Sequence, residues 1–154
     1  MENEIKIALI YGSTRAGRFC DKVAAWVAKQ VSARAEFTLD VIDPAFPPTH
    51  AAAEAGDACD MVWLRQHMGN ADAFIVVTPE YNHGYPAGLK SLIDSIGAEW
   101  QAKPVAFVSY GGISGGLRAV EQLRQVFART AHRYDPRLGK FRKRVAAVRR
   151  RRHA

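Results

Sequence analysis

Cysteine is scarce in this chain of 154 residues, which contains only Cys20 and Cys59. Their spacing matches neither a C-x-x-C redox motif nor a zinc-binding pattern, so we expect two reduced thiols and no metal site. No apolar run approaches the roughly 18 residues of a membrane-spanning helix, and the amino-terminal segment lacks the pattern of a secretion signal. These absences predict a soluble, cytoplasmic protein without a membrane partner.

Sequence signatures of nucleotide triphosphate binding and of serine hydrolases are also missing. The segment Gly12–Gly17 has nearly the spacing of a P-loop, but Arg18 stands where the lysine belongs and Phe19 where Ser or Thr would hold Mg²⁺. A Rossmann G-x-G-x-x-G is absent, and Ser109 and Ser114 lack the G-x-S-x-G context of a nucleophile. We therefore reject both classes.

Positive charge is distributed unevenly along the chain. The net charge is +7 and the isoelectric point is near 9.7. From Arg129 to Ala154 there are 11 Lys and Arg residues and one acid, Asp135, so residues 1–128 carry a charge of −3. An inference to nucleic acid rests on this tail alone, above all on Arg149–Arg152. A solvated basic tail is the simpler interpretation, and we do not expect a nucleic-acid partner.

Apolar runs alternate four times with stretches of helical periodicity, and the length fits one domain. This alternation predicts an α/β fold, a doubly wound parallel sheet with helices on both faces and right-handed crossovers. The predicted strands are 5–11, 37–42, 74–77 and 105–110, and the predicted helices are about 19–31, 57–70, 89–96 and 117–127.

The carboxyl-terminal part departs from this pattern. We expect Ser114 to be the N-cap of the fourth helix, and Tyr134–Pro136 to follow the end of that helix. The short apolar run Val145–Val148 is a weak candidate for a fifth strand. If it is not one, the sheet has four strands and an edge that a partner subunit or the tail must cover.

Polar loops follow the first, third and fourth strands, whose carboxyl ends lie along one edge of a doubly wound sheet. The first loop carries the hydroxyl groups of Ser13 and Thr14 and the guanidinium groups of Arg15 and Arg18. With the free N–H groups at the start of a helix, these groups suit a phosphate. A plain polar turn is the alternative for this loop taken by itself.

The other two loops suit a flat ligand. Tyr81, His83 and Tyr85 offer aromatic and polar faces, although such residues also cap sheet ends or pack at subunit interfaces. Ser109–Gly112 ends in two glycines, which let the backbone approach a ring closely but also occur in ordinary turns. The sequence thus predicts a planar ligand that also carries a phosphate.

A catalytic acid–base pair is not apparent. The four histidines outside the aromatic loop stand apart in segments that we expect to be exposed, so surface or hydrogen-bonded histidines explain them better than ligands do. They are His50, His67, His132 and His153. The difficult chemistry is therefore expected to belong to a cofactor, with no catalytic residue in the chain itself.

Three segments resemble, in order, the NAD(P)H-dependent FMN reductases of the flavodoxin-like fold. They are Gly12–Arg15, then Thr78–Pro86 with Leu89-Lys90, then Ser109–Gly112 with Gly115–Arg118. The resemblance covers about residues 5–128 and implies the sheet order 2-1-3-4-5. It divides the chain into a flavodoxin-like FMN-binding domain, residues 1–132, and an atypical basic tail, residues 133–154.

The resemblance also implies which residues contact FMN at the carboxyl edge. Those facing the phosphate would be Ser13, Arg15, Arg18 and Cys20, where Cys20 replaces a serine that is frequent in relatives. Those lining the isoalloxazine would be Pro79, Glu80, Tyr81, Asn82 and His83. Those at its pyrimidine end would be Ser109, Tyr110, Gly111 and Gly112.

The implied activity is hydride transfer from NADPH or NADH to flavin N5, and then to a quinone, azo compound, metal oxyanion or flavin. The implied partners are this small-molecule acceptor and a second copy of the chain, in a homodimer or homotetramer built through the third helix. Two alternatives remain at this point. One is a non-enzymatic flavin-binding electron carrier, whose body would normally be more acidic, and the other is a module that binds nucleic acid through the basic tail.

Overall fold

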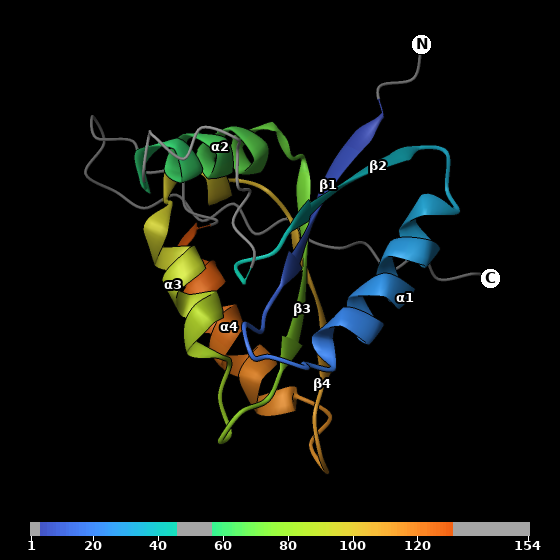
Figure 1. The fold of residues 1–154 in the computed structure, drawn as a ribbon, viewed down its shortest axis with the longest axis vertical. Coiled ribbons are helices and arrows are strands. Elements are labelled where there is room, and N and C mark those ends of the chain that lie inside the picture. Colours follow the sequence, from blue (N-terminus) through green and yellow to red (C-terminus); the bar gives the residue numbers. More distant parts are fainter. Residues whose placement is uncertain (1–3, 46–56, 131–154) are drawn as a thin grey trace, which may run out of the picture.

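The computed structural model describes residues 4–45 and 57–130, and it shows one four-stranded parallel sheet in the order β2-β1-β3-β4 (Figure 1). The predicted fold class and the order of these four strands are confirmed. The strands are β1 (Ile5–Tyr11), β2 (Phe37–Ile42), β3 (Ala73–Pro79) and β4 (Val105–Tyr110), and the helices are α1 (Cys20–Ser32), α2 (Asp57–Asn70), α3 (Ala87–Ser95), the 3₁₀ helix η1 (Ala98–Trp100) and α4 (Leu117–Thr130).

The strand β1 lies inside the sheet, hydrogen-bonded to β2 on one side and to β3 on the other. Ala8, Leu9 and Ile10 are completely buried. A strand covered on both faces needs apolar residues at successive positions, which explains the continuous apolar run in the sequence. This central position places the loop after β1 beside the end of β3.

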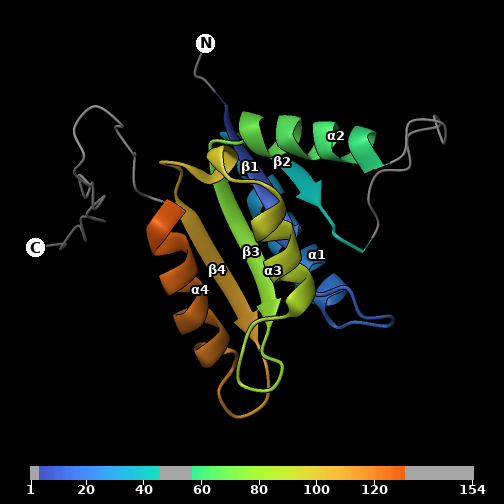
Figure 2. The ribbon, with the colours of Figure 1, turned by 90° about the vertical axis from the view of Figure 1, so that its left-hand side faces the viewer.

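The helices form two layers. Both views show α1 on one face of the sheet and α2, α3 and α4 on the other (Figures 1 and 2). Because successive side chains of a strand point to opposite faces, Phe74 and Val76 of β3 pack in the core beneath α2–α4, whereas Val77 packs in the core beneath α1. Two separate apolar cores thus fix the sheet between the layers.

An aromatic cluster holds the core on the three-helix face. The ring of Trp100 in η1 meets Phe74 at a centroid distance of 4.7 Å and Phe127 of α4 at 5.2 Å, both edge to face. Its indole N–H donates to the carbonyl of Ile93 at 3.3 Å. Trp100 therefore ties the end of α3 and the side of α4 to the start of β3.

In the described part of the chain, β4 forms one edge of the sheet. Phe19, just before α1, is 57% exposed and its ring meets that of Tyr110 in β4 at a centroid distance of 5.6 Å, while Trp26 of α1 is 60% exposed. The fifth-strand candidate Val145–Val148 and the proposed domain boundary at residue 132 lie outside the described residues, so both stay predictions. Within residues 4–45 and 57–130, no helix has the length and hydropathy needed to cross a membrane.

The predicted N-cap of the fourth helix is wrong. The helix α4 begins at Leu117, so the residue before it is Gly116 and not Ser114. Gly116 has a φ of +90°, which is not helical, and the carbonyl of Ser114 instead accepts a turn hydrogen bond from Leu117 N–H at 3.0 Å. The segment between Tyr110 and Leu117 therefore forms a hydrogen-bonded turn that is separate from α4.

The loops after β1, β3 and β4 emerge at the same end of the sheet. Figure 2 shows those after β3 and β4 side by side below the strands, with the loop after β1 next to them. The predicted convergence of the three loops is therefore found in the structure.

Candidate functional site

The first loop is tied to β3 at its start. Gly12 N–H donates to the carbonyl of Val77 at 2.7 Å. A Cβ on Gly12 would stand only 2.6 Å from that same oxygen, so no larger residue fits without a shift of the backbone. This contact fixes the position at which the first loop leaves β1 beside β3.

Ser13 and Tyr81 join the first loop to the second. Ser13 is fully buried, and its hydroxyl hydrogen-bonds to the Tyr81 hydroxyl at 2.8 Å. The guanidinium carbon of Arg15 lies 3.7 Å from the centroid of the Tyr81 ring, within the range of a cation–π contact. Two predicted phosphate residues therefore touch a predicted ring residue.

The structure places Arg18 differently from Arg15. The Arg18 side chain is 3% exposed, and its guanidinium donates to Asp21 at 2.7 Å, to both oxygens of Asp43 and to the Ser13 carbonyl. The hydrogen bond to Asp43 is the main reason why the pKa of Arg18 is raised, against the opposing effect of burial. Arg18 thus braces the first loop against the segment after β2. Asp43, which sequence reasoning missed, could have been found because it too follows a strand at the carboxyl edge.

Cys20, the first residue of α1, lies beneath the first loop. Its thiol is fully buried and points to the carbonyl of Val77 at an Sγ–O distance of 3.7 Å. Burial raises the pKa of this thiol, so it is neutral near pH 7. Burial, with added effects of Cys20, also raises the pKa of the neighbouring Tyr110 phenol. Hydrogen-bonding effects of Tyr110 and of the Gly12 and Ser13 backbone oppose the rise in the pKa of Cys20, so the thiol takes part in the polar contacts beneath the first loop.

The second loop is a tight two-residue turn. Tyr81 and Gly84 exchange two backbone hydrogen bonds, at 2.9 and 3.0 Å, around Asn82 with φ +49° and His83 with φ +66°. Two successive positive φ angles are typical of a type I′ turn, in which asparagine is well tolerated. The carbonyl of His83 accepts from Gln122 Nε2 of α4 at 3.1 Å. The turn is thereby fixed to the helix that follows the third loop.

Glu80 connects the second loop to the third. Its backbone N–H donates to the carbonyl of Tyr110 at 3.0 Å. Its carboxylate accepts from the backbone N–H of Arg118 at 3.0 Å and from Arg118 Nη1 at 2.6 Å. Burial opposes ionisation, but the hydrogen bonds from Ser114 and Arg118 outweigh it and lower the pKa of the Glu80 carboxyl.

The third loop is compact because of its glycines and Ser109. The Ser109 hydroxyl donates to the Gly115 carbonyl at 3.0 Å, and a Cβ on Gly116 would lie 2.6 Å from Ser109 Cβ. In contrast, a Cβ on Gly112 would meet nothing within 4 Å. The Ser109 side chain thus stabilises the third loop through a hydrogen bond within it. The backbone at Gly112, in contrast, borders open space that a ring could enter.

His67 is held by other side chains. Its Nδ1 lies 2.5 Å from an Asp40 carboxylate oxygen of β2, and its ring stacks on Trp63 at a centroid distance of 4.0 Å. This confirms the interpretation of His67 as a hydrogen-bonded histidine. His50, His132 and His153 lie outside the described residues.

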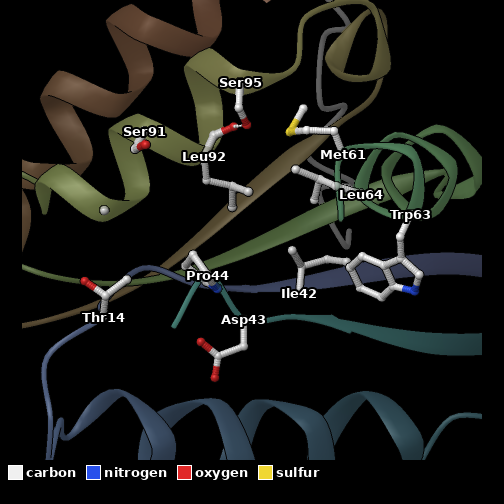
Figure 3. Close-up of a pocket in the computed structure, with 11 residues that line it drawn as sticks. Thr14, Ile42, Asp43, Pro44, Met61, Trp63, Leu64, Ser91, Leu92 and Ser95 are labelled. Carbon is white, nitrogen blue, oxygen red and sulfur yellow. Dashed lines mark hydrogen bonds between the residues drawn. The ribbon is translucent and has the colours of Figure 1, made fainter. Parts of the chain in front are cut away.

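A cavity of about 350 Å³ opens between α2, α3 and the end of β2 (Figure 3). Thr14 lies at one end of it and Trp63 at the other, with Leu64 and Leu92 between them. Of its lining residues, Thr14 alone belongs to the first loop, and none of the predicted cofactor-binding residues takes part. The cavity therefore borders the first loop at Thr14 and otherwise extends between α2 and α3, away from the second and third loops.

The residues at that edge fit a phosphorylated planar group. Arg15 is exposed, its backbone N–H donates to the Ser13 hydroxyl at 3.4 Å, and its guanidinium lies over the Tyr81 ring, so a charged donor that suits an anion stands beside the first loop. The Tyr81 ring and the open backbone side of Gly112 suit a flat ring. The three loops that carry them are fixed to one another by the Ser13–Tyr81 and Glu80–Arg118 contacts.

Comparison with known proteins identifies a family to which the chain is similar. The sequence profile of the family described as NADPH-dependent FMN reductase matches residues 5–141. An NAD(P)H-dependent FMN reductase of Schizosaccharomyces pombe is 37% identical over 121 residues, which cover 72% of this chain and 60% of that protein. A quinone reductase of Escherichia coli strain K12 is 30% identical over 133 residues, which cover 82% of this chain and 71% of that protein. This chain therefore spans about three fifths of the length of the Schizosaccharomyces relative.

A solved structure shows the same fold. A flavoenzyme NAD(P)H:(acceptor) oxidoreductase from Paracoccus denitrificans superposes with a TM-score of 0.63. The two chains are 24% identical, and the superposition covers 82% of this chain and 72% of the other. The flavodoxin-like fold of this chain is thereby shown independently of its close sequence relatives.

Proposed function

Because this chain belongs to the NADPH-dependent FMN reductase family, we propose that it binds FMN where its three loops meet. It would use NADPH or NADH to reduce a quinone, with an azo compound, a metal oxyanion or a free flavin as other acceptors. Bound FMN would accept hydride from the nicotinamide and pass electrons to the acceptor. The observation that carries the proposal is the Ser13–Tyr81 hydrogen bond, which joins the phosphate-type loop to the ring-type loop.

The first loop would hold the phosphate. Ser13 and Arg15 are its hydroxyl and guanidinium donors, and both already lie against Tyr81. Arg18 would act indirectly, since its guanidinium is engaged by Asp21 and Asp43 and by the loop's own carbonyl at Ser13. The resulting charge-assisted contact would depend mainly on Arg15.

The second and third loops would orient the ring and shield it from water on one side. The I′ turn presents Tyr81, Asn82 and His83, and the open backbone of Gly112 allows close approach next to Tyr110. The chain's contribution is binding and orientation.

Three finer points rest on the resemblance and are proposals too. They are a cytoplasmic location, a homodimer or homotetramer built through α3, and the division into residues 1–132 and a basic tail. Sedimentation of the wild-type protein tests the assembly. A monomer at micromolar concentration would contradict a stable dimer.

FMN binding can be tested by fluorescence, because flavin emission changes when the ring leaves water. The purified protein is titrated with FMN, and then NADPH oxidation is followed with and without a soluble quinone. Saturable binding together with steady, quinone-dependent oxidation supports the proposal. Binding without turnover would identify a flavin carrier instead, and no binding would refute the proposal.

A further inference from the structure

The carboxylate of Glu80 is fully engaged inside the protein. One oxygen accepts the backbone N–H of Arg118 at 3.0 Å, and the other accepts Nη1 of the same residue at 2.6 Å. The Glu80 side chain is only 6% exposed, while that of Arg118 is 48% exposed. Such a two-point, charge-assisted contact fixes both the distance and the orientation of the pair.

This contact caps α4 from outside the helix. Arg118 is the second residue of α4, and the first N–H groups of a helix lack partners within it. A carboxylate there also meets the positive end of the helix dipole. The cap comes from the end of β3 rather than from the residue that precedes the helix, so it fixes the start of α4 relative to the sheet.

The contact closes the third loop at both ends. On the strand side, Glu80 N–H holds the carbonyl of Tyr110 at 3.0 Å. On the helix side, the carboxylate holds Arg118, and residues 111–117 lie between these two points. Gly111 packs inside the loop, where an added Cβ would lie 3.3 Å from Glu80 Cβ. Glu80 therefore hydrogen-bonds to both ends of the third loop, to Tyr110 at its start and to Arg118 at its end.

We propose that Glu80 and Arg118 are positioning residues, forming a clamp that holds the third loop in place to receive the flavin ring. The carboxylate of Glu80 serves this clamp and does not contact the ring. This inference rests on the proposed function as far as the ring is concerned. The clamp itself is a property of the protein without any ligand.

The test compares Glu80→Ala, Arg118→Ala, Arg118→Lys and the double alanine variant. Glu80→Ala removes the cap and the ion pair, whereas Arg118→Ala keeps the backbone N–H and removes the ion pair alone. FMN affinity is expected to fall roughly threefold to thirtyfold in Glu80→Ala, less in Arg118→Ala and least in Arg118→Lys. Because the two residues form one contact, the double variant should bind FMN with the same affinity as Glu80→Ala.

Two further readouts separate positioning from general destabilisation. The visible circular dichroism of bound FMN should change in the same direction in Glu80→Ala and Arg118→Ala, because both release the same loop. A matched control is Glu99→Gln, which alters another Glu–Arg pair, with Arg65 at 3.4 Å, away from the loops. That variant should keep wild-type FMN affinity and circular dichroism.

Amide hydrogen exchange without FMN tests the clamp independently of the proposed function. Residues 111–118 should exchange about tenfold faster in Glu80→Ala than in wild type, with β1 unchanged. Unchanged exchange in this segment would overturn the clamp, even if wild type binds FMN. If wild type binds no FMN but the exchange responds, the proposed function fails and the clamp stands. A loss of FMN affinity in Glu80→Ala without faster exchange of residues 111–118 would indicate direct contact with the ring and overturn the positioning role.

Discussion

At the scale of single residues, the site depends on a small number of contacts with distinct purposes. Arg15 is exposed and lies over Tyr81, whereas Arg18 is buried between Asp21 and Asp43. Sequence alone gave both arginines the same expected role, because it shows residue type and spacing but not the partners supplied by distant segments. The carboxylates of Asp21 and Asp43, which hydrogen-bond to Arg18, explain why the two differ.

Arg15→Ala should weaken FMN binding by about 1.5 to 3 kcal/mol, the usual size of a lost hydrogen bond to a charged group. Isothermal titration with FMN measures this change. Arg34→Ala is the control, since Arg34 forms an exposed pair with Glu36 at 3.6 Å and should leave the affinity unchanged. Equal affinities for wild type and Arg15→Ala would show that Arg15 does not bind the phosphate.

Gly12→Ala should lower the free energy of unfolding by about 1 to 3 kcal/mol, because its Cβ would collide with the Val77 carbonyl at 2.6 Å. It should also weaken FMN binding, since it moves the first loop. The control is Gly69→Ala in α2, where a Cβ meets nothing within 4 Å and alanine favours the helix. Urea denaturation of both variants checks this, and equal losses in the two would argue against the close approach.

The lowered pKa of Glu80 makes the clamp sensitive to acid. Its stabilising effect is fully present above the ordinary carboxyl value of 4.5 and is lost as the pH falls from there through the lower pKa of the folded state. The difference in unfolding free energy between wild type and Arg118→Ala should therefore shrink below pH 4.5. Urea denaturation across this range measures it, and a constant difference would mean that Glu80 does not ionise in the contact.

At the scale of elements, periodicity predicted the strands and helices well because burial dominates them. The apolar run of β1 and the helical spacing of α1 follow directly from which faces are covered. The start of α4 at Leu117 agrees with the prediction, but its N-cap was predicted wrongly, since the cap comes from Glu80, 38 positions before Arg118. Local capping rules assume a neighbouring residue and cannot anticipate a cap from another strand.

Trp100→Ala should cost about 3 to 5 kcal/mol of unfolding free energy, because it empties the space between Phe74 and Phe127. The matched variant is Trp26→Ala, whose side chain is 60% exposed, and it should cost much less. Guanidinium denaturation distinguishes them. A similar loss in both variants would mean that η1 is not part of the core.

At the scale of the whole molecule, fold and function follow from how the sheet gathers three loops at one edge. The sequence predicted this convergence, since parallel strands bring their carboxyl ends together. It did not reveal the Ser13–Tyr81 and Glu80–Arg118 contacts, because the partners are 68 and 38 positions apart. Such contacts become visible only once the chain is folded.

The central claim is that these loops hold an FMN that NADPH can reduce. The most direct measurement loads the purified protein with FMN, removes free flavin by gel filtration, and adds NADPH without oxygen while the visible absorbance is recorded. We predict that flavin stays with the protein, that its visible bands bleach on addition of NADPH, and that they return when a quinone is added. Flavin that elutes apart from the protein, or that stays oxidised with NADPH, would contradict the account.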